Sequence, residues 1–326
     1  MSDAGNGLIC AYLRTPNGIW NEAHWVDIEN WRPEQGLLWV HLDADDSHAQ
    51  NYLRSLQDVD QLVPDALLAE ETRPRSVSIR DGLLAILRGV NLNHGADPED
   101  MVSIRLWIEQ SRLLSTRRRP LMAVQDVQQR LTTNRGPSSI AELFTQLVGS
   151  LVERASSVIE DIDAEADRLE SVVVDAPSQE VRAQLAAMRR QTIALRRYLA
   201  PQREALGRIQ SEEFTWLDRR SKANLREITD RVVRYVEDLD LVRERAAVIQ
   251  DELVNRQAEQ MNRNMYLLAI VATVMLPLGF ITGLLGVNVD GIPGSSNTPW
   301  AFTAVTIGLV LVALLEFWVL RRMRWV

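Results

Sequence analysis

The chain has 326 residues but only one cysteine, Cys10, and only four histidines, none of which follows His94. A single thiol excludes a disulfide framework and any metal site built from several cysteines. The residues after His94 offer neither imidazole nor thiolate, the ligands that hold zinc tightly in proteins. We therefore expect no high-affinity zinc site in that part of the chain.

Basic residues are in the minority, with 36 lysines and arginines against 44 aspartates and glutamates, which gives a formal net charge of −8. This balance argues against binding to nucleic acid and indicates a surface that tolerates or attracts cations. The chain also lacks a phosphate-binding loop, a nucleophile elbow, a paired-metal ligand set and a glycine-rich nucleotide fingerprint. We therefore expect that the protein is not an enzyme and needs no cofactor.

Charge is absent from two long segments near the C-terminal end, residues 264–289 and residues 291–315. A bilayer core about 30 Å thick needs about 20 helical residues at 1.5 Å each. The pattern predicts membrane spans at about 265–285 and 301–320, joined by an outer loop at 286–300. The last part of the chain, from residue 263 onward, is therefore expected to be a transmembrane hairpin.

Arginines precede the first predicted span and follow the second, whereas the loop between the spans has none. The positive-inside rule then predicts that both termini lie in the cytoplasm. The first thirty residues contain no apolar stretch of signal-peptide length, so we expect about 260 residues before the first span to remain in the cytosol.

Short apolar runs separated by turn residues predict six strands in the first 120 residues. The runs are 8–13, 37–41, 77–79, 83–90, 101–109 and 112–116, with short helices expected at 47–56 and 64–71. After Pro120 no strand candidate remains, and helical periods cover about 121–132, 138–174, 178–209 and a last segment that begins near Trp216. We expect a cytosolic α/β domain over residues 1–137 and a helical stalk over residues 138–262.

The last helical segment has no proline or glycine between Phe214 and Pro277, so one helix can run from about Leu217 through the membrane to Leu285. Apolar residues in its first part recur in alternating steps of three and four, as in a helix packed along partner helices. They are Leu225, Ile228, Val232, Tyr235, Leu239, Val242, Ala246, Ile249 and Leu253.

A second series follows seven-residue repeats on the opposite side of this helix and changes from polar to small and apolar residues. It comprises Asp251, Asn255, Ala258, Asn262, Met265, Ala269, Ala272, Leu276, Gly279, Gly283 and Gly286. Small residues also let membrane helices pack closely, so the series alone fits either a packing face or a pore lining. Two spans enclose an aqueous path only if several copies each place one helix around an axis. We therefore expect a closed ring in which this series lines the pore and Asp251 lies in the cytosolic funnel.

The first span closes with Gly286-Val287-Asn288, and a short loop, a second span and a basic C-terminus follow. In this arrangement the chain resembles the CorA superfamily of divalent-cation transporters, most members of which carry Gly-Met-Asn at this position. The valine and three further motifs are similar to the ZntB branch, described as zinc transporters. These motifs are Gly291-Ile292-Pro293-Gly294, Glu71-Thr72-Arg73-Pro74-Arg75 and Arg196-Arg197-Tyr198-Leu199-Ala200-Pro201-Gln202-Arg203.

The resemblance implies a funnel-shaped homopentamer in the bacterial inner membrane, embedded in lipid, with Asn288 of each subunit in a ring at the outer entrance. Carboxamide oxygens suit a hydrated divalent ion because they accept hydrogen bonds from its water shell. The resemblance also implies zinc as cargo and proton-assisted uptake, with magnesium, cobalt or nickel transport as the alternative. Gly286 would end the helix through its backbone freedom, and Asp290 would add carboxylates at the outer mouth.

Weak metal-ligand candidates lie where a predicted strand turns into a helix, at His41, Asp43 and His48. We favour a strand end and a helix N-cap with solvated carboxylates as the interpretation of this segment. The acidic residues between 160 and 170 are expected to form a solvated helix surface. Glu316 is expected to reach the cytosolic interface, and the alternative is a role in proton coupling. From a different functional class, a membrane-anchored scaffold with a coiled stalk is the competing interpretation.

Overall fold

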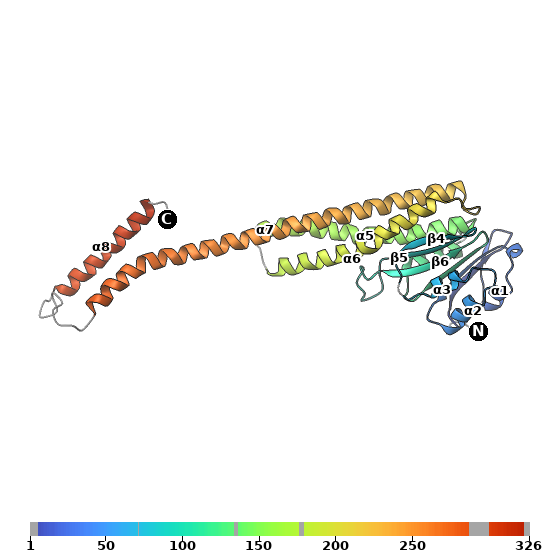
Figure 1. The fold of residues 1–326 in the computed structure, drawn as a ribbon, viewed down its shortest axis with the longest axis horizontal. Helices are drawn as coiled ribbons and strands as arrows, with labels where there is room; N and C mark the ends of the chain where they lie inside the picture. Colours follow the sequence, from blue (N-terminus) through green and yellow to red (C-terminus); the bar gives the residue numbers. More distant parts are fainter. Residues whose placement is uncertain (1–5, 71, 134–135, 176–178, 287–299, 323–326) are drawn as a thin grey trace. The chain divides into compact units, whose positions relative to one another are not determined.

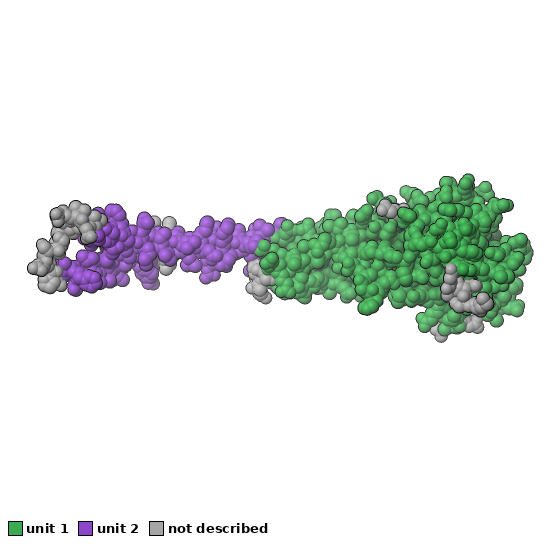
Figure 2. All heavy atoms as spheres, turned by 90° about the horizontal axis from the view of Figure 1, so that it is seen from below, with its two compact units in different colours: residues 1–250 green, residues 251–326 purple. Residues whose placement is uncertain are grey.

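The structure, a computed structural model, describes residues 6–70, 72–133, 136–175, 179–286 and 300–322. It contains two compact units, residues 1–250 and residues 251–326, which are green and purple in Figure 2. Helix α7, Arg219–Leu285, is continuous through the boundary between these units. The division at residues 137 and 262 that we expect from the sequence remains a prediction.

Seven strands of the first unit form one sheet in the order β2-β1-β3-β7-β6-β5-β4. They are β1 (Leu8–Arg14), β2 (Trp20–Glu22), β3 (Leu37–Asp43), β4 (Arg75–Ile79), β5 (Gly82–Gly89), β6 (Val102–Ile108) and β7 (Arg112–Arg117). Neighbouring strands are antiparallel except β3 and β7, which are parallel. The six predicted strands are confirmed, whereas β2, with three residues, is too short to show an alternating pattern.

The first unit also contains helices on both sides of its sheet. They are α1 (Trp25–Glu29), the 3-10 helix η1 (Pro33–Gln35), α2 (Ser47–Ser55), α3 (Leu62–Leu68), α4 (Met122–Thr132), α5 (Ile140–Asp175), α6 (Gln179–Ser211) and the first part of α7. Helices α2 and α4 match their predicted bounds within one residue. Helix α3 begins at Leu62, before the predicted start at Pro64. The helix can include this proline because a proline in the first turn removes no helix hydrogen bond.

Successive side chains of a strand point to opposite faces of a sheet, and here both faces are covered. From β3, Leu38, Val40 and Leu42 pack into a core with α1, α2 and α3. Trp39 of the same strand belongs to a second core, which it shares with α4, α5, α6 and α7. The first unit therefore has three layers, with the sheet in the middle (Figure 1). The predicted α/β domain with a mostly buried sheet is confirmed.

The predicted apolar seam of α7 is confirmed. Leu225, Val232, Leu239 and Ala246 have exposed fractions of 0%, and Tyr235 is partly buried against the same core. Ion pairs reinforce the packing, since Arg245 of α7 binds Asp163 and Glu170 of α5 at 2.9 Å each. The acidic stretch of α5 that we expected to be solvated is thus partly neutralised by α7.

The second unit contains the C-terminal part of α7 and α8, Ala301–Arg322. Windows of 18 residues in these two helices reach mean hydropathies of 2.3 and 2.2, with 0% and 6% of their residues buried. Both helices that we predicted for the two spans are present. Their exposed apolar side chains, among them Leu268, Phe280 and Phe302, need lipid or other chains around them.

Candidate functional site

The residues of the predicted pore series that the structure describes all lie on α7 or directly after it, and all are exposed in the single chain. This holds for the polar members Asn255 and Asn262 as well as for Met265 and Leu276, which have exposed fractions of 57% and 77%. The series therefore lies free of the subunit's own packing.

Two glycines of this series are not required by contacts within the subunit. Apart from the neighbouring backbone of α7 itself, a β-carbon placed on Gly279 or Gly283 would meet no atom within 4 Å. Glycine in a helix interior costs about 0.5–1 kcal/mol relative to alanine, so these positions lower the intrinsic stability of α7. Contacts within the subunit therefore do not explain why these two positions are glycine.

The end of α7 differs from the expectation for Gly286. Its N–H donates to the carbonyl oxygens of Thr282, at 3.0 Å, and Gly283, at 3.2 Å. The described glycines with positive φ do not include Gly286, so the end of the helix does not use the conformational freedom that only glycine has. Val287, Asn288 and Asp290, the other predicted residues of the outer entrance, lie outside the described residues.

A column of carboxylates extends the predicted series toward the start of α7. Seven-residue steps back from Asp251 reach Glu244, Glu237 and Asp230, and all four side chains are exposed. None of them makes an ion pair within the described part of the chain, unlike the acids of α5 that bind Arg245. Sequence reasoning stopped at Asp251 and missed this column, although the seven-residue spacing was visible.

The weak metal-ligand candidates have structural partners instead. His41 is fully buried, and burial lowers the pKa of its imidazole to about 3. Its Nδ1 lies 2.8 Å from Oγ of Ser115, which donates to the Val40 carbonyl, so Nδ1 carries the proton and donates to Ser115. The ring of His48 packs edge-on against Trp25, with 4.4 Å between centroids.

Two of the three carboxylates between these histidines bind backbone groups, and the third, Asp45, pairs with Arg118. Asp46 caps α2 by accepting the N–H groups of His48 at 2.8 Å and Ala49 at 3.1 Å. Asp43 accepts the N–H of Asp45 at 2.9 Å. Within the described residues no group of three or more His, Cys, Asp or Glu side chains comes close enough to hold a metal ion. The geometry favours the strand end and N-cap.

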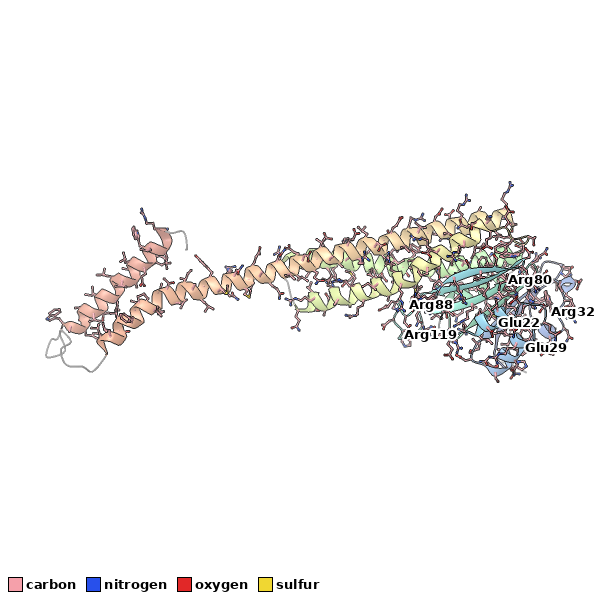
Figure 3. The ribbon with its side chains drawn as sticks, viewed as in Figure 1. Glu22, Glu29, Arg32, Arg80, Arg88 and Arg119 are labelled. Atoms are coloured by element: carbon pink, nitrogen blue, oxygen red, sulfur yellow. The ribbon has the colours of Figure 1, made fainter. Side chains whose placement is uncertain are left out.

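Two of the motifs behind the family resemblance meet at Arg88 of β5, which is labelled in Figure 3. Its guanidinium donates to the Thr72 carbonyl at 2.8 Å and lies 4.1 Å from the ring centroid of Tyr198. Its backbone N–H donates to Oε1 of Gln202 at 2.7 Å. On another side of α6, Arg196 binds Asp240 of α7 at 2.6 Å. The motif in α6 thus connects the sheet to α7, and Arg88 is a residue that sequence reasoning did not select.

Comparison with known proteins agrees with this architecture. The family described as CorA-like Mg2+ transporter protein matches residues 34–322. The chain belongs to this family. It is therefore a divalent-cation transporter of the CorA type and not an enzyme, and the resemblance stated from the sequence is confirmed.

Individual relatives cover nearly the whole chain. Divalent cation transporter CmaX of Pseudomonas aeruginosa is 40% identical over 323 residues, which are 98% of this chain and 97% of CmaX. Zinc transport protein ZntB of Yersinia enterocolitica is 35% identical over 292 residues, 88% of this chain and 87% of that protein. The structure of full-length CmaX matches with a TM-score of 0.85 at 37% identity and covers 100% of both chains. The predicted fold, with an α/β domain, stalk helices and two apolar helices, is confirmed.

Proposed function

We propose that this protein carries zinc across the bacterial inner membrane through a pore formed by five identical subunits. In this arrangement the first span of each subunit contributes the series from Asn255 to Gly283 to the pore, and Asn288 forms the outer ring. Both termini lie in the cytoplasm. The relatives named as zinc and divalent-cation transporters support this proposal, as does the valine of Gly286-Val287-Asn288.

The observation that carries the pore is the pair of glycines in α7. Gly279 and Gly283 lower the helix propensity of a span and relieve no contact within the subunit. A helix that turns this side toward a ring axis uses the small residues to keep the path open. The two asparagines earlier in the series then offer amide oxygens to the water shell of a passing ion.

The carboxylate column supports a cation as cargo. Asp230, Glu237, Glu244 and Asp251 are exposed and unpaired within the described residues, and in a pentamer each position would contribute five charges. Carboxylates along a confined path raise the local concentration of cations by attraction and need not bind them tightly. This suits transport, because an ion that is held tightly is released slowly.

Zinc is proposed as the cargo and magnesium, cobalt or nickel as the alternative. The absence of histidine and cysteine after His94 means that the path would accept a hydrated ion through weak contacts with oxygen atoms. Selection of zinc over other divalent cations would then depend on the width of the pore and on its outer ring, and not on residues that coordinate zinc directly.

Proton-assisted uptake is the third part of the proposal. Glu316 is the carboxylate within the second predicted span, and its Oε2 is buried without a hydrogen-bond partner in the described part of the chain. Arg322, one turn and a half further along α8, lies over the ring of Trp318 at 5.6 Å. Glu316 is therefore the candidate for a group that binds a proton within the membrane.

The test is zinc flux into proteoliposomes with a pH gradient of either sign. The proposal predicts zinc uptake that a proton gradient in the same direction accelerates and an opposite gradient slows. Equal concentrations of magnesium, cobalt and nickel serve as competing cargoes, and Asn288→Ala should lower the flux. Faster transport of magnesium than of zinc would contradict zinc as the cargo. A zinc flux that does not depend on the pH gradient would contradict proton coupling.

A further inference from the structure

The first unit contains a pocket that the proposed ion path does not use. The pocket has a volume of about 870 Å³, and sites for small molecules typically have volumes of about 300–1,000 Å³. Its walls come from the end of α1, the segment that follows α1, helix α2 and the first residue of β7. None of its described lining residues belongs to α7. The pocket is therefore a candidate for a second, separate binding site.

Two aromatic side chains with fixed orientations line this pocket. Trp31 is held in place because its Nε1–H donates to the carbonyl oxygen of Gly36 at 3.2 Å. The ring of Tyr52 packs edge-on against Trp25, with 5.2 Å between the ring centroids. Aromatic rings in fixed positions offer a stacking surface to a flat ring of a ligand. The pocket therefore favours a planar aromatic molecule over an aliphatic one.

Arg112 of β7 brings a guanidinium group to the pocket, but carboxylates already compensate its charge. The side chain is 5% exposed, its Nε donates to Oε2 of Glu109 at 2.9 Å, and its Nη2 donates to Oδ2 of Asp58 at 2.7 Å. Because two carboxylates oppose one guanidinium, an anionic group beside Arg112 would also meet their negative charge. This position therefore favours a neutral hydrogen-bond acceptor.

Two hydrogen-bond donors of the lining residues have no partner in the described part of the chain. They are Nη1 of Arg112 and the hydroxyl of Tyr52, and neither atom is fully buried. Burial raises the pKa of Tyr52 to about 12, so its hydroxyl keeps the proton at neutral pH. Glu29 and Arg32, which are exposed and labelled in Figure 3, also line the pocket and have opposite charges. The pocket thus offers free donors without a net positive charge.

We infer that this pocket binds the base of a nucleoside or nucleotide. A nucleobase is a flat and neutral ring whose edge carries hydrogen-bond acceptors, and it stacks readily on aromatic side chains. The ring would stack on Trp31, and an acceptor on its edge would take the free donors of Arg112 and Tyr52. The inference does not depend on the proposed pore or cargo, so its failure would leave the proposed function unchanged.

Isothermal titration calorimetry of the full-length protein in detergent tests this inference. The probes are adenosine, guanosine, cytidine and uridine, which present the base without a phosphate group. At least one of them should bind with a dissociation constant of about 1 mM or below. Indole serves as the comparison, because it has a flat ring but no acceptor on its edge. Binding of none of the four nucleosides, or tighter binding of indole, would overturn the inference.

Substitutions in the pocket test which side chains hold the base. Trp31→Ala should weaken the binding of the tightest nucleoside about tenfold through loss of stacking, and Tyr52→Phe about fivefold through loss of one hydrogen bond. Wild-type affinity in both variants would contradict the assignment.

A matched pair of variants on α2 tests the place of binding without removing a packed side chain. Asn51 and Arg54 are both exposed on this helix, but only Asn51 lines the pocket. Asn51→Trp should fill the pocket and abolish nucleoside binding, whereas Arg54→Trp should bind like the wild type, and thermal unfolding of both variants checks that they are folded. Equal binding by these two variants would overturn the inference.

Discussion

Replacing Gly283 of α7 by leucine should block transport without destabilising the subunit. A β-carbon at this position meets no atom within 4 Å apart from the neighbouring backbone of its own helix, so the subunit leaves space where a side chain would begin. Removal of a glycine from a helix interior adds about 0.5–1 kcal/mol of helix stability. In the proposed ring, five leucine side chains would form an apolar constriction that excludes water. A barrier of about 1.4 kcal/mol lowers a rate about tenfold, and we expect at least that loss in zinc flux.

The assay compares zinc uptake into proteoliposomes with thermal unfolding and oligomer mass of the same preparations. Gly308 of α8 is the matched control, because a β-carbon there also meets nothing within 4 Å. Gly308→Leu should keep both flux and stability near the wild-type values. Wild-type flux in Gly283→Leu, or equal losses in both variants, would refute the assignment of this face of α7 to the pore.

Three other predictions concern charge and folding. The double variant Glu237→Gln and Glu244→Gln should lower zinc uptake more at low salt than at high salt, because the Debye length falls as salt rises. The control Glu165→Gln, which removes an ion pair with Arg168, should not show this salt dependence. A loss of uptake that is independent of salt would contradict attraction between these carboxylates and the cation. Burial lowers the pKa of His41 from 6.5 to about 3, so below pH 6.5 the unfolded chain binds a proton that the folded protein does not bind. The free energy of unfolding should therefore fall by about 1.4 kcal/mol per pH unit, which is about 2 kcal/mol at pH 5. Chemical unfolding at pH 7 and pH 5 should show this loss in the wild type and less of it in His41→Gln. Asp46→Ala should lower the free energy of unfolding by about 0.5–2 kcal/mol through loss of the α2 cap, and an unchanged unfolding curve would contradict that role.

The long helices were predictable from the sequence because each carries many repeats of one period. The seam from Leu225 to Leu253 covers four heptads, and its buried residues lie where the period places them. The apolar C-terminal part of α7 and the helix α8 were equally predictable, since a long uncharged stretch has few interpretations other than a membrane-spanning helix. Short elements gave no such signal. The helix α1 has five residues, fewer than two helical turns, and the sequence pattern did not reveal it.

Contacts between distant segments could not be predicted from local patterns. The parallel pairing of β3 with β7 joins residues about seventy positions apart, and no residue spacing in the sequence predicts this pairing. Arg88 illustrates the same limit, because its partners Thr72, Tyr198 and Gln202 come together only in the fold. The carboxylate column is a different case. Its spacing was present in the sequence, but its lack of ion pairs, in contrast to the acids of α5, became visible only when Arg245 was placed.

The central claim is that one face of α7 lines the path of the ion. Zinc flux through Ala272→Cys before and after a charged thiol reagent tests it most directly, with Val271→Cys, one residue away on another face of the helix, as the control. The account predicts that the reagent stops flux through Ala272→Cys and spares Val271→Cys. Flux that continues through modified Ala272→Cys would contradict it.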